Sequence, residues 1–277
     1  MSSAAAARET DEYLLGTDPV ELERLRFQHQ AWLGPLHELL ERADLCAGAR
    51  VLDLGCGPGL TTIELAQRVG PTGRVVACDQ SARFLATLRQ ECARLGLAQV
   101  EPLESGVEAL ALPAASLDAA YARWLFCWLA DPLPVLERVA RALRPGGRLL
   151  LQEYLDWGAM QLLPHGPAFA RAVEACLASW KAGGATISFA AEVPALAPRA
   201  GFTLEHLRPR ARLGGVGSPE WRWLEEFFRS YLPRVVERGL MSRAELDAWS
   251  AEWAQRAAAG GSYVVAPTMA DVILRRS

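Results

Sequence analysis

The pattern of apolar and polar positions alternates between two periods over the first half of the chain. Between residues 51 and 153, short apolar runs typical of strands are separated by longer segments whose apolar residues recur every three or four positions. The runs predict strands at 51–54, 74–78, 98–103, 118–122 and 147–153, and the periodic segments predict helices at 60–69, 81–95 and 131–143. This alternation predicts an α/β fold built on a doubly wound, mostly parallel sheet.

The segments before and after this region extend the same fold. Residues 20–43 have apolar positions at helical spacing, interrupted by Gly34-Pro35, so residues 1–44 are expected to form a tail and an N-terminal helical cap. After a helix near 167–182, the segments that start at 203 and at 262 have strand character and would complete a seven-stranded sheet. Residues 45–277 are therefore predicted to form one α/β domain.

An insertion separates the last two predicted strands. Ser218-Pro219 fits an N-cap and first helical position, and Ser242 with Glu245 forms a capping-box pattern for a second helix. We expect residues 215–260 to form a helical lid over the carboxyl edge of the sheet. The apolar stripe of the first helix consists of Leu224, Phe227, Phe228, Tyr231, Leu232, Val235 and Val236.

Composition narrows the class of protein. A chain of 277 residues with 51% hydrophobic positions can bury a large core. Its formal charge of −3, with arginines scattered among acids, offers no surface for a polyanion, so no nucleic-acid partner is expected. No run reaches the roughly 18 apolar residues of a membrane span, and the start has no apolar signal core, which predicts a cytoplasmic protein without a membrane partner. The six cysteines include no CxxC pair, so neither a metal nor a disulfide framework is expected.

A glycine-rich loop, within the stretch VLDLGCGPGL at 51–60, directly follows the first predicted strand. Ligands of open α/β sheets bind beyond the carboxyl ends of the strands, so this loop marks the binding crevice. The nicotinamide fingerprint G-x-G-x-x-G/A requires Gly or Ala at the position of Leu60, and a phosphate-binding P-loop requires a Lys that does not follow these glycines. The pattern that remains is D-x-G-x-G-x-G.

This pattern resembles motif I of the class I S-adenosylmethionine-dependent methyltransferases. The likeness continues through VVACDQS (75–81) and through residues 111–153 with their L-R-P-G-G turn, and so covers about residues 45–155. The resemblance implies S-adenosylmethionine as cofactor and S-adenosylhomocysteine as product. A cofactor without phosphate needs close backbone approach and an acid that meets its amino group. The loop residues implied in this role are Asp53, Gly55, Cys56, Gly57 and Gly59.

The resemblance also assigns the ribose and adenine contacts. Asp79, at the tip of the second strand, would bind both ribose hydroxyls, with Gln80 beside the adenine; as an alternative, Asp79 could be a helix N-cap. Family members often carry an aspartate after the third strand, whereas this chain has Gly106 at that place. The adenine contact would then fall to the Val107 backbone, with Glu108 beside it.

Residues that follow the fourth and fifth strands are candidates for the rest of the site. Arg123 is expected to contact the cofactor and Trp124 the acceptor, against the alternative that both only cover apolar core. A general base is needed only if the acceptor must lose a proton, and His165 or Tyr154 would supply it. Further candidates to face the acceptor are Asp156 and, on the N-terminal cap, His29.

The function that these residues favour is transfer of a methyl group to oxygen, nitrogen or carbon of a small molecule by in-line displacement. Trp124, Trp157, Trp221 and Trp223 suggest an apolar or aromatic acceptor. Three alternatives stay open: a protein or peptide methyltransferase with a long open groove, a non-catalytic S-adenosylmethionine-binding protein of the same fold, and, against Leu60, a nicotinamide enzyme. A homodimer is the starting expectation for the oligomeric state, on general frequency alone.

Overall fold

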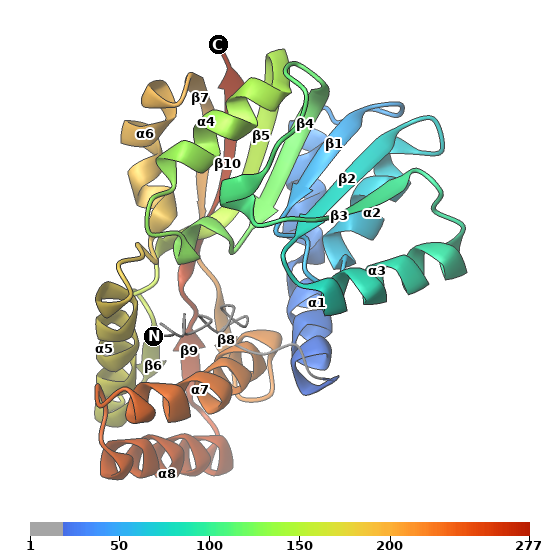
Figure 1. Ribbon diagram of the computed structural model, residues 1–277. Helices are drawn as coiled ribbons and strands as arrows, with labels where there is room; N and C mark the ends of the chain where they lie inside the picture. Colours follow the sequence, from blue (N-terminus) through green and yellow to red (C-terminus); the bar gives the residue numbers. More distant parts are fainter. Residues whose placement is uncertain (1–18) are drawn as a thin grey trace, which may run out of the picture.

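The computed structural model describes residues 19–277 and is built around one large sheet (Figure 1). Its seven strands lie in the order β3-β2-β1-β4-β5-β10-β7, and only β10 runs antiparallel to its neighbours. This arrangement confirms the predicted doubly wound, mostly parallel sheet. The strands are β1 (Arg50–Leu54), β2 (Arg74–Asp79), β3 (Val100–Glu104), β4 (Leu117–Arg123), β5 (Leu143–Asp156), β7 (Phe202–Arg210) and β10 (Thr268–Arg276).

Helices cover both faces of the sheet. On one face α1 (Pro19–Arg42), α2 (Leu60–Val69) and α3 (Ala82–Leu95) share a core with Val51, and on the other α4 (Leu133–Ala142) and α6 (Phe189–Arg199) share a core with Leu52. Successive residues of a strand point to opposite faces, so the apolar run of β1 supplies both cores. Two short 3-10 turns, η1 (Val107–Ala109) and η2 (Phe126–Trp128), follow β3 and β4.

Helix α1 is unbroken, which corrects the predicted interruption at Gly34-Pro35. A proline inside a helix removes one backbone hydrogen bond and crowds the preceding turn. Here the helix is held by side chains on both sides of the proline, since Trp32 and Leu36 are fully buried and Leu39 is almost so. Burial of three large apolar side chains outweighs the local cost of one proline.

A second, smaller unit lies below the large sheet in Figure 1. It consists of α5 (Pro167–Ala182), α7 (Pro219–Glu237), α8 (Arg243–Ala259) and a three-stranded sheet in the order β6-β9-β8. The strands β6 (Gln161–Leu163), β8 (Leu213–Gly215) and β9 (Tyr263–Val265) are only three residues long, so no periodicity predicted this sheet. Ala266-Pro267 divides the predicted strand at 262–276 into β9 and β10.

The two helices of the insertion begin as their capping patterns predict. The Ser218 hydroxyl accepts a hydrogen bond from the Trp221 amide at 3.2 Å, and Ser242 and Glu245 form a reciprocal capping box.

Over residues 19–277, none of the helices is long and apolar enough to span a bilayer. The same residues hold no cluster of three or more His, Cys, Asp or Glu side chains suited to a metal ion.

Candidate functional site

The glycine loop between β1 and α2 has a backbone that other residues would adopt only with strain. Gly55, Gly57 and Gly59 all have positive φ, at 68°, 55° and 86°. A Cβ on Gly59 would lie 2.2 Å from the Cδ1 atom of Leu88, whereas a Cβ on Gly57 would meet nothing within 4 Å. Gly59 is therefore required for packing against α3, and Gly57 faces open space that a ligand can enter.

The first three amide groups of this loop donate hydrogen bonds to other residues of the protein. The N–H groups of Gly55 and Cys56 both donate to the carbonyl oxygen of Cys78, at 2.9 and 3.0 Å. The N–H of Gly57 donates to Oδ2 of Asp79 at 2.8 Å. A loop that binds phosphate needs these donors free to face the anion. The loop is therefore built for a ligand that it approaches closely without donating these three hydrogen bonds.

Two carboxyl groups flank the loop. Asp53 is buried at the end of β1, where its Oδ2 accepts a hydrogen bond from the Thr62 hydroxyl at 2.6 Å, and burial raises its pKa to about 6. Asp79 is half-buried at the tip of β2, and burial raises its pKa as well. Its Oδ1 accepts from the Ser81 amide at 2.8 Å, while the Ser81 hydroxyl caps α3, so the N-cap of α3 is Ser81 and not Asp79.

Arg123 joins three elements at the carboxyl end of β4. Its Nη2 lies 3.1 Å from both His29 Nδ1 on α1 and the Thr61 hydroxyl on α2, and its guanidinium lies 4.8 Å from the centre of the Trp124 ring. A guanidinium only donates, so Nδ1 of His29 accepts and its Nε2 carries the proton, 3.7 Å from Glu64. The Nη1 atom of Arg123 is buried without a hydrogen-bond partner in the described part of the chain. A buried donor without a partner is costly, which makes this atom a candidate for contact with a ligand.

The expected adenine side lies at η1. Gln80 and Glu108 are exposed, and Val107 is buried. The Glu108 carboxylate lies 3.6 Å from the position that a Cβ on Gly106 would occupy. Glu108 can therefore place a carboxylate beside the position where family members often have an aspartate. The sequence analysis expected Glu108 beside the adenine, and the shape of the η1 turn, which the sequence pattern did not reveal, brings its carboxylate to this place.

An aromatic wall stands next to Arg123. Trp32 of α1, Trp124 after β4, Tyr154 of β5 and Trp223 of α7 form it, and each comes from a different element. Ring centres lie 5.8 Å apart for Trp32 and Trp124, 5.5 Å for Trp32 and Trp223, and 6.4 Å for Trp124 and Tyr154. Trp124 has a positive φ of 50°, which is rare for a bulky residue, and its amide donates to the carbonyl oxygen of Gln152 at 3.2 Å. The wall belongs to the buried apolar cluster of the smaller unit, so this cluster reaches Arg123 with an aromatic side.

The other predicted acceptor residues lie at different places. His29 is buried and bonded to Arg123, whereas Asp156 is exposed at the end of β5 and His165 is exposed in the loop before α5. Trp157 and Trp221 are buried in the core of the smaller unit, against Trp180 and Trp253. The structure therefore brings Trp124, Tyr154 and Trp223 together and leaves these other residues outside the wall.

One buried acid at the site was not predicted from the sequence. Glu153 of β5 accepts hydrogen bonds at its Oε1 from the amides of Leu125 and Phe126, at 2.8 and 2.9 Å. Burial raises the pKa of this carboxyl group to about 7. These bonds fix the segment that directly follows Arg123 and Trp124. A polar pair, Gln152 and Glu153, directly after three leucines of a predicted strand is the signal that could have drawn attention to it.

Comparison with known proteins agrees with this architecture. A family described as a methyltransferase domain matches residues 51–147. The chain is 43% identical over 115 residues to trans-aconitate 2-methyltransferase of Azoarcus sp. (strain BH72), a match that covers 42% of this chain and 43% of the relative. It is 32% identical over 195 residues to the enzyme of that name from Methylobacterium nodulans, covering 68% of this chain and 71% of the relative. The match to the Azoarcus enzyme therefore spans less than half of that enzyme's length, whereas the match to the Methylobacterium nodulans enzyme spans more than two thirds.

Solved structures share the fold. The [4+2]-cyclase SpnF superposes with a TM-score of 0.57 at 20% identity, over 89% of this chain and 82% of that one. At this identity the likeness concerns the fold alone. The family match over residues 51–147 and the sequence match to the Methylobacterium nodulans enzyme show that the chain belongs to the class I S-adenosylmethionine-dependent methyltransferases.

Proposed function

We propose that the protein transfers a methyl group from S-adenosylmethionine to an oxygen, nitrogen or carbon atom of a small, apolar or aromatic metabolite. The observation that carries this proposal is the direction of the loop amides, because Gly55, Cys56 and Gly57 donate inward to Cys78 and Asp79. A phosphate-bearing dinucleotide would not find these three donors free, whereas S-adenosylmethionine finds a buried acid, Asp53, for its amino group and a second acid, Asp79, for its ribose. This supports S-adenosylmethionine over a nicotinamide cofactor.

The residues of the site fit this cofactor. Gly57 leaves space above the loop, and each oxygen of Asp79 keeps a lone pair beside its amide bond for a ribose hydroxyl. The buried, unpartnered Nη1 of Arg123 fits the cofactor carboxylate. When bound, S-adenosylmethionine supplies a methyl group already activated by its sulfonium. In the proposal, Gln80, Val107 and Glu108 hold the adenine.

The protein's own contribution would be position and exclusion of water. The aromatic wall would orient the acceptor against the methyl group, and alignment of two reactants can supply several kcal/mol of a barrier. Tyr154 is the better placed of the two candidate bases, since it is buried in the wall while His165 is exposed. In this proposal residues 215–260 act as the lid, because Trp223 on α7 closes the wall over Trp124.

Two alternatives can be weighed against the same residues. A peptide methyltransferase needs a long open groove, and the contact of Trp223 with both Trp32 and Trp124 favours a covered pocket. A protein of this fold that binds the cofactor without methyl transfer would keep the same loop, Asp79 and Arg123. Only product analysis separates that case from the proposed one.

The test is calorimetric titration with S-adenosylmethionine, followed by measurement of S-adenosylhomocysteine formed with a panel of small acceptors. We expect the wild type to bind and Asp79→Ala to weaken binding at least 100-fold, because two ribose hydrogen bonds to a charged group are lost, each worth about 1.5–3 kcal/mol. Arg123→Gln should weaken binding about tenfold, and Glu192→Ala, on an exposed residue of α6, serves as the control that should bind as the wild type does. Binding of NAD in place of S-adenosylmethionine would contradict the proposal, and binding without turnover would favour the non-catalytic alternative.

A further inference from the structure

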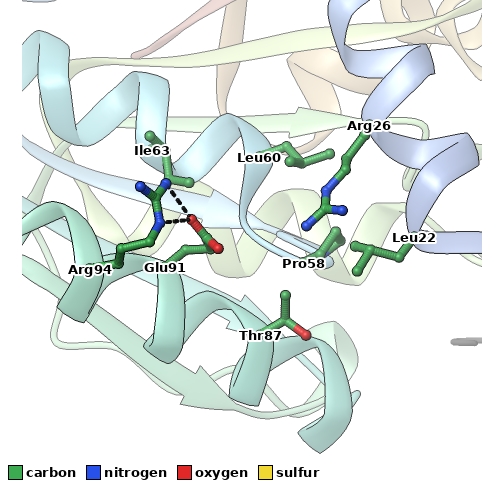
Figure 2. A pocket seen from close by; sticks show the side chains of 8 residues that line it. All are labelled: Leu22, Arg26, Pro58, Leu60, Ile63, Thr87, Glu91 and Arg94. Atoms are coloured by element: carbon green, nitrogen blue, oxygen red, sulfur yellow. Dashed lines mark hydrogen bonds and ion pairs between the residues drawn. The ribbon is translucent and has the colours of Figure 1, made fainter. Parts of the chain in front are cut away.

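A second pocket lies behind the glycine loop, between α1, α2 and α3 (Figure 2). Its volume of about 310 Å³ falls at the lower end of the ~300–1,000 Å³ range of small-molecule sites. Pro58 and Leu60, which flank Gly59, belong to its lining. Asp79 and Arg123 are not among the residues that line it within the described chain. The pocket is therefore separate from the proposed cofactor site and shares one loop with it.

The apolar part of this pocket is entirely aliphatic. Leu22 of α1 and Leu60 and Ile63 of α2 point into it, with Pro58 beside them, and residues 19–277 contribute no aromatic ring to the lining. The aromatic wall of the main site has the opposite character. An aliphatic lining of this size suits a short, flexible hydrocarbon chain, because burial of each CH₂ contributes about 0.8 kcal/mol without any requirement for ring stacking.

The charged groups of the pocket differ at its two ends. At one end Arg94 donates twice to Oε2 of Glu91, at 2.7 and 2.9 Å, so this guanidinium is neutralised. At the other end Arg26 reaches over Pro58 (Figure 2), and its ion pair to Glu23 is long at 3.9 Å, between two exposed side chains. Such exposed pairs contribute little. Among the described residues that line the pocket, Arg26 therefore has the guanidinium that can bind an anion from solution.

We propose that this pocket binds a small aliphatic carboxylate, with its head group on Arg26 and its chain over Leu60 and Ile63. A carboxylate matches the fork of a guanidinium and can form two parallel hydrogen bonds to it. The proposal goes beyond methyl transfer: the assignment of the pocket does not depend on it, whereas the coupling between the pocket and the cofactor rests on the proposed function.

Binding in this pocket would act on the glycine loop. The loop packs tightly on α3, since a Cβ on Gly59 would lie 2.2 Å from Cδ1 of Leu88. Thr87, the neighbour of Leu88 in α3, also belongs to the lining of the pocket. A chain inserted between α2 and α3 bears on this contact and so on the loop that holds the cofactor. The two ligands would then change each other's affinity by the same factor.

The experiment titrates the full chain with octanoate, 1-octanol and octylamine, each with and without S-adenosylmethionine. We expect octanoate to bind with one-to-one stoichiometry and both other probes to bind about fivefold more weakly. Because Arg26 is exposed, Arg26→Gln should lower the affinity for octanoate about fivefold, and Ile63→Trp, which fills the pocket, should remove binding. Arg83→Gln, on an exposed residue of α3 outside the lining, is the matched control and should stay within twofold of the wild type.

The outcomes separate this proposal from the proposed function. Octanol binding as tightly as octanoate, or octanoate binding unchanged in Arg26→Gln and Ile63→Trp, would overturn the pocket assignment. Octanoate affinity equal with and without bound S-adenosylmethionine would overturn the coupling to the loop. Octanoate binding in a protein that does not bind S-adenosylmethionine would support the pocket while the proposed function fails.

Discussion

The cofactor half and the acceptor half of the site are built in opposite ways. The residues proposed for the cofactor lie between positions 53 and 123 and are joined by hydrogen bonds, such as that from the Gly57 amide to Asp79. The aromatic wall proposed for the acceptor draws on residues from 32 to 223 and is joined by ring contacts, such as that between Trp32 and Trp223. Directional hydrogen bonds would fix the position of the cofactor, whereas the shape of the acceptor side depends on the packing of many rings. The cofactor half is therefore the part that short motifs describe.

The most severe test of this separation is Trp223→Ala. Removal of a buried tryptophan should lower the free energy of unfolding by about 3–5 kcal/mol, while the affinity for S-adenosylmethionine stays within about twofold. Chemical denaturation and calorimetry measure the two quantities. Trp223→Phe is the milder variant if the first does not fold. A tenfold loss of cofactor affinity in either variant would mean that the halves are not separate.

Within the cofactor half, the glycines can be compared with each other. Gly59→Ala combines a left-handed backbone with a clash against Leu88 and should cost about 3 kcal/mol of stability. Gly57→Ala has the backbone strain without the clash and should lower the free energy of unfolding by about 1 kcal/mol. It should nevertheless lower the affinity for S-adenosylmethionine more than Gly59→Ala does, since its methyl group enters the space proposed for the ligand. Equal losses of stability in urea unfolding would refute this division of roles.

A pH-dependent effect is expected for Glu153, at the border of the two halves. Its pKa in the folded protein is raised to about 7 from an ordinary 4.5, so the native state holds the proton more tightly than the unfolded chain. The resulting stability is fully present below about pH 4.5 and is lost as the pH rises through 7, by an amount on the order of 3 kcal/mol.

Urea unfolding of Glu153→Gln between pH 4.5 and 8 measures this contribution. The variant keeps an uncharged acceptor for the Leu125 and Phe126 amides, so it should lose less stability than the wild type as the pH rises. Asp53, with a pKa raised to about 6, contributes the same trend in both proteins. Glu137→Gln, on an exposed residue of α4, is the control. Parallel pH profiles for wild type and Glu153→Gln would rule out the assignment.

What the sequence could predict follows from how local each feature is. The strand, loop and helix around Gly55 and the caps at Ser218 and Ser242 depend on neighbours in sequence, and the structure has all of them. The continuity of α1 through Pro35 depends on burial of its flanking residues against the sheet, which a local rule for proline does not include.

Features made by distant residues could not be predicted. The sheet of β6, β9 and β8 joins three segments that are each too short to show a period. The bonds from the Leu125 and Phe126 amides to Glu153 join residues nearly thirty positions apart in sequence. Tyr154 and His165 look equally suitable as bases in the sequence, and only their burial distinguishes them. Whether either acts as a base stays a prediction.

The small sheet has a consequence for how this protein could diversify. Gly215 and Tyr263 are partners across β8 and β9, so residues 216–262 leave the fold and return to it at adjacent points. The hairpin allows a segment of different length to join the same two strand ends, provided that it also supplies the buried side chains that Trp223 and Phe228 of α7 and Trp249 of α8 contribute to the core of the smaller unit. Under the proposed function, a graft of the whole segment between related chains would change the acceptor side of the site and leave β1 and β2 unchanged. Recombination at this one hairpin would then be a route to new acceptors.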